Sequence, residues 1–295
     1  MLLLLISTFL VGISTPLAAL LVEDHDPLVF AFYFLSALLM IQIPFIFRKW
    51  DEIKALVGKK EFGLVVVGSL IATCQYWCEF SSLKVGLPVS HVAFLTLTVP
   101  TWVMFYEYVR GRGQFSSVNK VIIAMIGSLA LILPTVGHQF TAGHLLPILT
   151  SIFMAAFLIT SKKSQEAGIS PLVVSFFNDL LALIGISFLI VINGKTHLVA
   201  IPANATGIFL YAALIGLLPG LFFLYGLRST KLITASTIIV IEPVIFGIVA
   251  LIVNFNELGL NFILGAIAIS VSSMPDSAFG MVRKARLVYL LNAFK

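Results

Sequence analysis

Long apolar runs follow one another along almost the whole chain and constrain its fold more than any other feature. A helix crosses the roughly 30 Å hydrocarbon core of a bilayer in about 20 residues. Because lipid offers no partner to backbone N–H and C=O groups, such runs are expected to be helical. We predict an all-α integral membrane protein with ten transmembrane helices, at 2–22, 28–47, 62–83, 88–109, 118–136, 145–161, 171–192, 206–227, 233–254 and 260–280.

Composition agrees with this prediction. Of the 295 residues 60% are apolar and only 11% are charged, and the mean hydropathy is +1.09, which leaves too few charges for the surface of a soluble domain. The run at 2–22 could be a signal peptide, but it lacks a basic start and a clear cleavage site, so we interpret it as a helix. Cys74 and Cys78 are interpreted as packing residues, and no metal ligand set or cofactor motif is recognised.

The basic residues predict the orientation. If the N-terminus is cytoplasmic, the cytoplasmic loops and tail collect all of the 18 Lys and Arg residues except Lys84 and Lys195. Cytoplasmic loops carry such an excess, so both termini are predicted to be cytoplasmic, in what we expect to be a bacterial inner membrane. The net charge of +5 is then a matter of topology, and nucleic-acid binding is not expected.

A weak internal repeat divides the chain. Aligning Pro100 with Pro243 matches two apolar runs broken by proline, and the glycine-led runs at Gly127 and Gly265 then follow at similar places. Each half contains five predicted helices, an odd number, so the second half would enter the membrane upside down. Inverted repeats around a midplane site are a recurring plan of secondary transporters.

The predicted domains are a first five-helix repeat at 1–137, a second, inverted repeat at 138–280 and a tail at 281–295. The tail combines basic residues with an apolar helical face, which is typical of a short amphipathic helix on the inner leaflet. A frayed tail or an expression scar is an equally good interpretation.

Three motifs resemble the EamA modules of the drug/metabolite transporter superfamily. They are Ile241-Glu242-Pro243 with the glycine-led last helix, Asn256-Glu257-Leu258, and Leu97-Thr98-Val99-Pro100 followed by Gly127. The resemblance implies a ten-helix carrier of small metabolites, often an exporter of amino acids. Family members often carry an arginine in the second helix, whereas residues 30–34 contain none.

Glu242 is the first candidate for the site, because an acidic residue near the bilayer centre usually faces a cavity or a partner. Pro243 follows it and deprives a carbonyl one turn earlier of its helical hydrogen bond. Two interpretations stay open. Glu242 binds a substrate ammonium or carries a proton, or it bridges two helices and holds the break.

A second cluster lies in the third predicted span. Gln75 and Glu79 are four residues apart and share a helix face, which we expect to line the cavity. Tyr76 could stack on a substrate or cation. Trp77 is interpreted as a residue of the membrane interface instead.

The remaining candidates lie in three other spans. His91, Thr98 and Trp102 surround Pro100 in the fourth span, Tyr225 is in the eighth, and Asn178 and Asp179 are in the seventh. Asp179 could pair with Lys162 or Lys163, either as an inner gate or as a salt bridge without a gating role. Pro100 and Pro243 are candidate hinges.

We therefore expect a secondary transporter that moves an amino acid or related zwitterionic or cationic solute by alternating access, with export favoured and protons as a possible coupling ion. An uptake carrier or exchanger for a nucleoside-like or S-adenosylmethionine-like cation is the first alternative. A structural or receptor subunit of the membrane is the second. No catalytic constellation is recognised, so an enzyme is not expected. Monomer and homodimer stay open.

Overall fold

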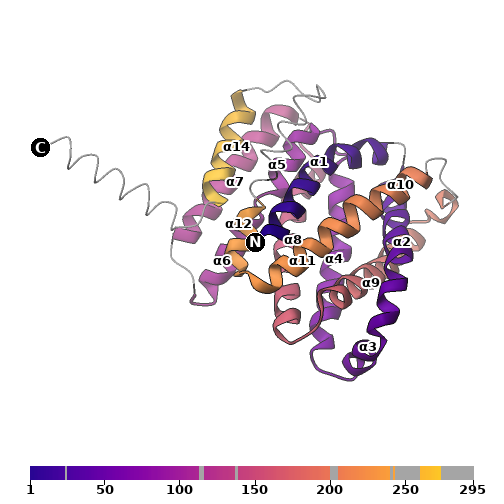
Figure 1. Ribbon diagram of the computed structural model, residues 1–295. Coiled ribbons are helices and arrows are strands. Elements are labelled where there is room, and N and C mark those ends of the chain that lie inside the picture. The colour runs from indigo at the N-terminus through magenta and orange to yellow at the C-terminus, as the bar shows by residue number, and fades with distance from the viewer. Residues whose placement is uncertain are drawn as a thin grey trace, which may run out of the picture.

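The computed structural model describes residues 1–23, 25–112, 116–136, 139–199, 205–239, 242 and 260–273. Every regular element in these ranges is helical, and they contain no strand (Figure 1). The predicted spans correspond to α1 (Leu2–Glu23), α2 (Pro27–Ile46), α4 (Phe62–Ser82), α5 (Val89–Thr96) with α6 (Val99–Val109), α7 (Ser116–Val136), α8 (Leu146–Glu166), α9 (Pro171–Ile192), α10 (Ala205–Tyr211) with α11 (Leu218–Ser229), α12 (Leu232–Ile238) and α14 (Leu260–Ser273).

Six of the described helical segments are long and apolar enough to cross a membrane. They are Pro27–Val57, Phe62–Ser82, Ser90–Val109, Ala142–Glu166, Pro171–Ile192 and Ala205–Ser229. Three apolar helices are shorter, at Leu2–Ile13, Val118–Pro134 and Leu260–Ser272. The prediction of a multi-pass helical membrane protein is thus confirmed, while the count of ten spans stays a prediction. Most of the predicted ninth span, with Pro243, and the tail lie outside the described residues.

The fourth predicted span is broken where its proline requires a break. Pro100 has no N–H to donate, and its ring would clash with the carbonyl of Thr96 one turn earlier. α5 accordingly ends at Thr96 and α6 begins at Val99. Between them the backbone N–H groups of Leu97 and Thr98 donate to the carbonyls three residues earlier, those of Phe94 and Leu95, at 3.2 and 3.4 Å. The predicted break is therefore confirmed, and the hinge role of Pro100 stays a prediction.

The eighth predicted span is not a uniform helix. Between α10 and α11 it widens into a π-helix, η4 (Ala212–Leu217), and Pro219 lies at the start of α11. Gly216 in this turn packs against α2, where an added Cβ would lie 2.8 Å from the ring of Phe34. Gly220 has no such neighbour within 4 Å, and both glycines line a cavity. Only at Gly216 does the close contact with α2 therefore require a glycine.

The loop predicted between the second and third spans contains a further short helix, α3 (Trp50–Val57). Ile53 and Leu56 are buried in a cluster with residues of α4 and α9. Glu52, at its start, accepts a 2.7 Å hydrogen bond from the backbone N–H of Ser170, just before α9. This contact fastens the α3 segment to the loop between α8 and α9.

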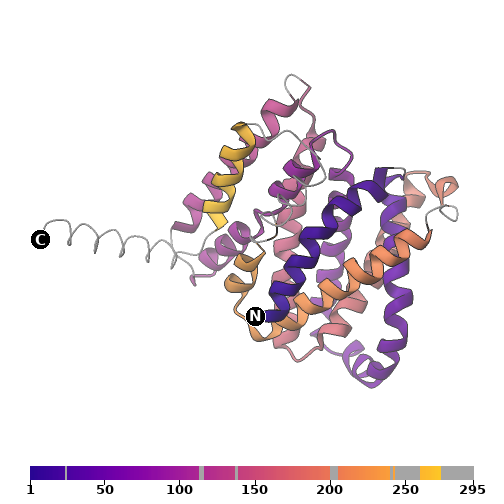
Figure 2. The same cartoon turned by 45° about the horizontal axis from the view of Figure 1, so that its top comes forward.

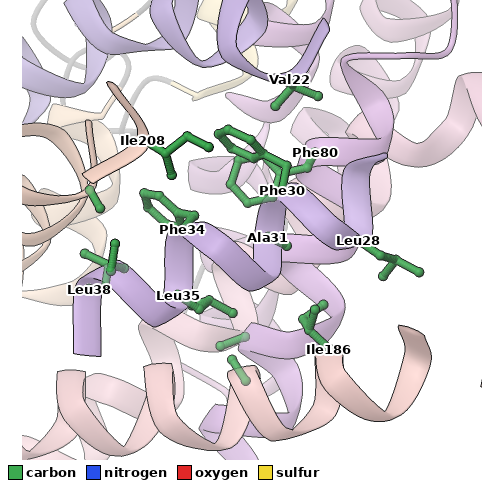
Figure 3. Packing of buried hydrophobic residues seen from close by; sticks show 14 of the residues in the cluster. Val22, Leu28, Phe30, Ala31, Phe34, Leu35, Leu38, Phe80, Ile186 and Ile208 are labelled. Atoms are coloured by element: carbon green, nitrogen blue, oxygen red, sulfur yellow. The ribbon is translucent and has the colours of Figure 1, made fainter. Parts of the chain in front are cut away.

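Helices distant in sequence lie side by side. α1 lies along α11 in both views, and α7 lies along α14 (Figures 1 and 2). A large apolar cluster joins α2, α4, α9 and η4, where the ring of Phe80 meets the rings of Phe30 and Phe34 edge to face (Figure 3). This cluster forms one wall of the cavity described below.

α7 and α14 cross at two glycines. A Cβ added to Gly127 would lie 3.0 Å from the carbonyl oxygen of Gly265, and one added to Gly265 would lie 2.9 Å from that of Gly127. Small residues let transmembrane helices approach this closely. The two helices are therefore held at backbone contact.

We expect Gly265→Ala to lower the thermal unfolding temperature, because the new methyl group would also lie 2.7 Å from Leu131. Overpacking of this kind costs about 1–3 kcal/mol. Gly63→Ala in α4 is the matched control, since nothing lies within 4 Å of its added Cβ. Thermal unfolding in detergent measures both, and equal stability of the two variants would contradict the close crossing.

Candidate functional site

A cavity of about 230 Å³ lies among the ends and breaks of several helices. Residues of α1, α2, α4, α5, α8, α10, η4 and α11 line it, together with Leu83, Ile239 and Glu242. Its polar lining consists of Ser7, Thr8, Gln75, Tyr76, Glu79, Ser82, Thr96, Thr150, Tyr211 and Glu242. Phe34, Phe80, Phe157 and Phe223 give it an aromatic wall.

Two carboxylates share this cavity. Glu79 accepts a hydrogen bond from the amide of Gln75 one turn earlier in α4, at 3.4 Å, and both residues line the cavity. Glu242 lines it from the second half of the chain, and its backbone N–H donates to the carbonyl of Ile239 at 2.9 Å. No Lys or Arg is among the described lining residues. The cavity therefore favours a positively charged group.

Tyr76 connects the cavity to a buried network. Its ring lines the cavity, and its hydroxyl donates to Oδ1 of Asp179 at 3.2 Å. The amide of Gln42 donates to Oδ2 of Asp179 at 2.6 Å, and the hydroxyl of Ser175 lies 3.5 Å from the same oxygen. Since Asp179 and Gln42 are both buried, these donors replace the water that a carboxylate would otherwise bind.

The predicted pairing of Asp179 with a lysine is wrong. Lys162 donates to the backbone carbonyls of Leu227, Arg228 and Thr230 at 2.9–3.2 Å, and Lys163 lies over the ring of Tyr106. Asp179 faces α2 and α4 inside the bundle, where uncharged donors satisfy it.

Asn178, like Asp179, is buried between α9 and its neighbours and is hydrogen-bonded to another helix. Its side-chain oxygen accepts a 3.0 Å hydrogen bond from the hydroxyl of Ser69 in α4. Asn178 and Asp179 thus bind α9 to α4 and α2 from adjacent positions. A gating role for either residue stays a prediction.

Thr98 and Trp102 lie at the helix break rather than in the cavity lining. The indole N–H of Trp102 donates to the hydroxyls of Ser151 and Thr98, at 2.9 and 3.1 Å, and these two hydroxyls are 2.6 Å apart. Together they tie the start of α6 to α8. Their predicted contact with a substrate stays untested.

His91 and Tyr225 also lie outside the cavity lining. The His91 ring packs on Phe262 of α14, with ring centroids 5.2 Å apart. Tyr225 is 43% exposed on the surface of α11. The candidate residues that meet at one cavity are therefore Gln75, Tyr76, Glu79 and Glu242.

Several lining residues escaped the sequence analysis. Ser7 and Thr8 lie in a leucine-rich run, and Tyr211 precedes η4. The hydroxyl of Ser7 donates to the carbonyl of Pro219 at 2.8 Å, which joins α1 to α11 beside the cavity. The adjacent hydroxyl residues of this apolar span, Ser7-Thr8 and Ser14-Thr15, were the available signal.

Comparison with known proteins decides the family. The EamA-like transporter family matches residues 1–133 and 141–274. The chain belongs to this family. It is a membrane transporter of a small solute and not an enzyme. An uncharacterized transporter of Clostridium kluyveri is 22% identical over 221 residues, which are 72% of this chain and 69% of that protein.

A solved crystal structure supports the fold of this EamA-like transporter. The two structures match over 97% of this chain and 97% of the other, with a TM-score of 0.64 and 15% sequence identity. At this identity the likeness concerns the fold alone.

The Asp179 network predicts that replacing Gln42 lowers the stability of the protein much more than replacing Gln165, another buried glutamine. Gln42→Leu leaves Asp179 with one donor fewer, and we expect a loss of about 1–3 kcal/mol in stability. Gln165→Leu is the matched control, because neither amide atom of Gln165 has a hydrogen-bond partner in the described part of the chain. Thermal unfolding of the two variants measures the difference, and a Gln165→Leu variant as unstable as Gln42→Leu would contradict it.

Proposed function

We propose that this EamA-like transporter carries an amino acid or a related zwitterionic or cationic solute, which binds in the 230 Å³ cavity. Glu79 and Glu242 would bind the ammonium group, with Gln75 positioning Glu79. Transport would proceed by alternating access of two inverted five-helix repeats around this cavity.

The meeting of Glu79 and Glu242 in one cavity carries this proposal. They come from opposite halves of the chain, so a cation between them would contact both repeats at once. Two carboxylates without a basic partner repel each other unless a cation or proton joins them. A bound ammonium group removes this repulsion, and so does a coupling proton.

The size of the cavity favours a small solute. Sites for drug-sized ligands are typically about 300–1,000 Å³, which exceeds the 230 Å³ found here. An amino acid is therefore a better candidate than an S-adenosylmethionine-like cation. Export follows the resemblance to exporters of the superfamily, and an uptake carrier or exchanger remains the alternative.

The helix packing supports ten spans in two inverted repeats, 1–137 and 138–280. The third predicted span, α4, packs against α8 and α9, the sixth and seventh. The counterpart of α4 is the eighth span, formed by α10, η4 and α11, and it packs against α1 and α2. The fifth and tenth spans, α7 and α14, correspond to each other and cross at corresponding glycines. This is the pattern that a two-fold pseudosymmetry axis would produce.

Contacts between loops support the predicted alternation of the loops between the two sides of the membrane, while the proposal of cytoplasmic termini rests on the distribution of the basic residues. Lys195, one of two basic residues predicted outside, forms a 2.7 Å ion pair with Asp26 of the first outer loop. Glu52 and Ser170, from two loops predicted to be cytoplasmic, contact each other at the opposite ends of α2 and α9. Loops assigned to the same side thus meet. The bacterial inner membrane remains part of the proposal.

Substrate flux into proteoliposomes tests the role of the two carboxylates. A screen of amino acids for thermal stabilisation comes first, since a ligand at about 100 times its Kd adds about 2.7 kcal/mol. We expect Glu242→Gln and Glu79→Gln each to lower the affinity for the stabilising solute about ten- to a hundredfold, as for a lost charged hydrogen bond.

Glu61→Gln is the isosteric control, because Glu61 precedes α4 and does not line the cavity. Its flux and affinity should equal those of the unmodified protein. Unchanged affinity in both cavity variants would contradict the proposed site.

A further inference from the structure

A second, larger cavity opens beside the first. It measures about 1040 Å³ and is formed by α6, α8, the end of α11 and α12, which lie together in the fold (Figure 1). We call it the basic vestibule, because five cations line it, namely Arg112, Lys162, Lys163, Arg228 and Lys231. Two acids, Glu107 and Glu166, also line it. These residues belong to loops and helix ends predicted to be cytoplasmic.

Two of the vestibule cations are held in place by the fold. The ammonium group of Lys162 donates to three carbonyls around the end of α11, which fixes α11 against α8. Lys163 lies 5.4 Å from the ring centroid of Tyr106, which holds its charge at the wall. Contacts with the surrounding helices therefore hold the charges of Lys162 and Lys163 at the vestibule wall.

The wall between the vestibule and the central cavity is thin. On α8, Leu158 lines the cavity while the next residue, Ile159, lines the vestibule. At the end of α12, Ile239 lines the cavity while Ile238 lines the vestibule. Leu158 and Ile239 are 1% and 2% exposed and belong to one apolar cluster, against which Ile238 also packs.

Charge changes sign across this apolar wall. The cavity side carries Glu79 and Glu242 and no basic residue among its described lining, whereas cations outnumber acids on the vestibule side. Clefts lined by one sign of charge concentrate ions of the opposite sign. A zwitterion approaching from the vestibule would meet a surface suited to its carboxylate before its ammonium group reached the two glutamates.

We propose that the basic vestibule is the cytoplasmic mouth of the transport route, and that Leu158, Ile159, Ile238 and Ile239 form its closed hydrophobic gate. The mouth would receive the carboxylate of a zwitterionic solute. This inference rests on the proposed function, because it extends the route to and from the same cavity. It assigns to α8 and α12 the movement that would open the route.

Thiol labelling from one side of the membrane tests the gate without any substrate. A cysteine-free chain is obtained by replacing Cys74 and Cys78, which are both free. Thr234→Cys then marks the vestibule and Thr96→Cys marks the cavity. Membrane-impermeant methanethiosulfonates, one anionic and one cationic, are added to sealed vesicles, and Lys60→Cys in a separate sample establishes which face is outward.

From the face that carries Lys60, we expect Thr234→Cys to react readily and Thr96→Cys about 10- to 1,000-fold more slowly, because an open state that is minor is populated at about 0.1–10%. The anionic reagent should be favoured at Thr234→Cys and the cationic reagent at Thr96→Cys, each relative to its rate with a free thiol. Equal rates at the two positions, or the same charge preference at both, would overturn the proposal.

Smaller side chains in the wall should let the reagent pass more easily from the vestibule into the central cavity. We expect Ile238→Ala and Ile159→Ala, each half-buried at its position, to raise the rate at Thr96→Cys several-fold and to leave the rate at Thr234→Cys unchanged. Ile267→Ala on α14 is the control, since Ile267 is 55% exposed and lines neither cavity. Thermal unfolding shows whether each variant is folded, and two wall residues from different helices provide independent tests.

A wall variant that folds but leaves the rate at Thr96→Cys unchanged would overturn the gate. This failure is distinguishable from failure of the proposed function. Loss of affinity in Glu242→Gln together with equal labelling at Thr96→Cys and Thr234→Cys would keep the amino-acid site and reject the gate. Slow labelling at Thr96→Cys with unchanged affinity in both glutamate variants would give the opposite result.

Discussion

Lipid supplies no hydrogen bonds, so the backbone groups inside the bundle need partners within the protein, and a buried polar side chain is costly unless it finds one too. Most buried hydroxyls find one on their own helix. Thr8, Ser69 and Ser128 each donate to the carbonyl four residues earlier, at 2.7–2.9 Å. A hydroxyl satisfied in this way costs little in an apolar setting, and so such residues can be placed wherever small side chains are needed.

The same requirement explains where the helices are interrupted. At Leu97 and Thr98 the chain leaves α-helical geometry, and the nearby hydroxyls of Thr98 and Ser151 bond each other and the Trp102 indole. At Pro219 the carbonyl accepts a hydrogen bond from Ser7 of another helix. Both interruptions lie close to cavity residues, because irregular backbone at membrane depth is tolerated where it is packed in protein or faces a cavity. The breaks and the cavity thus belong to one arrangement.

Much of the helical layout could be predicted because it depends on local properties of the sequence. Span 171–192 has the predicted bounds as α9, and the break before Pro100 follows from the chemistry of proline alone. α3 was missed because its eight residues are too few for a membrane span and include Asp51, Glu52 and Lys54, although its apolar residues follow a helical period. The π-turn of η4 was missed as well, since no residue type specifies it.

The candidate site could be predicted only in part, for a similar reason. Gln75 and Glu79 share a face by spacing on one helix, and this is visible in the sequence. Whether Trp102 faces the cavity or Ser151 depends on how α6 is rotated against α8, and that rotation is set by tertiary packing. Asp179 illustrates the same limit. A lysine on the predicted cytoplasmic side was a reasonable partner by charge, but the rotation of α9 turns Asp179 toward Gln42 and Tyr76.

The contact between Tyr76 and Asp179 also connects the site to the helices around it. Tyr76 lines the cavity, while Asp179 is bonded to Gln42, a buried residue of α2. A solute that displaced the Tyr76 hydroxyl would leave Asp179 with one donor fewer in a place that water does not reach. The cost of that loss would fall on the packing of α2 against α9. These two helices are predicted counterparts in the two repeats, and they are joined at opposite ends by the pairs Asp26–Lys195 and Glu52–Ser170. Under the proposed transport mechanism, occupancy of the cavity would therefore affect the packing of α2 against α9, at the interface between the two proposed repeats.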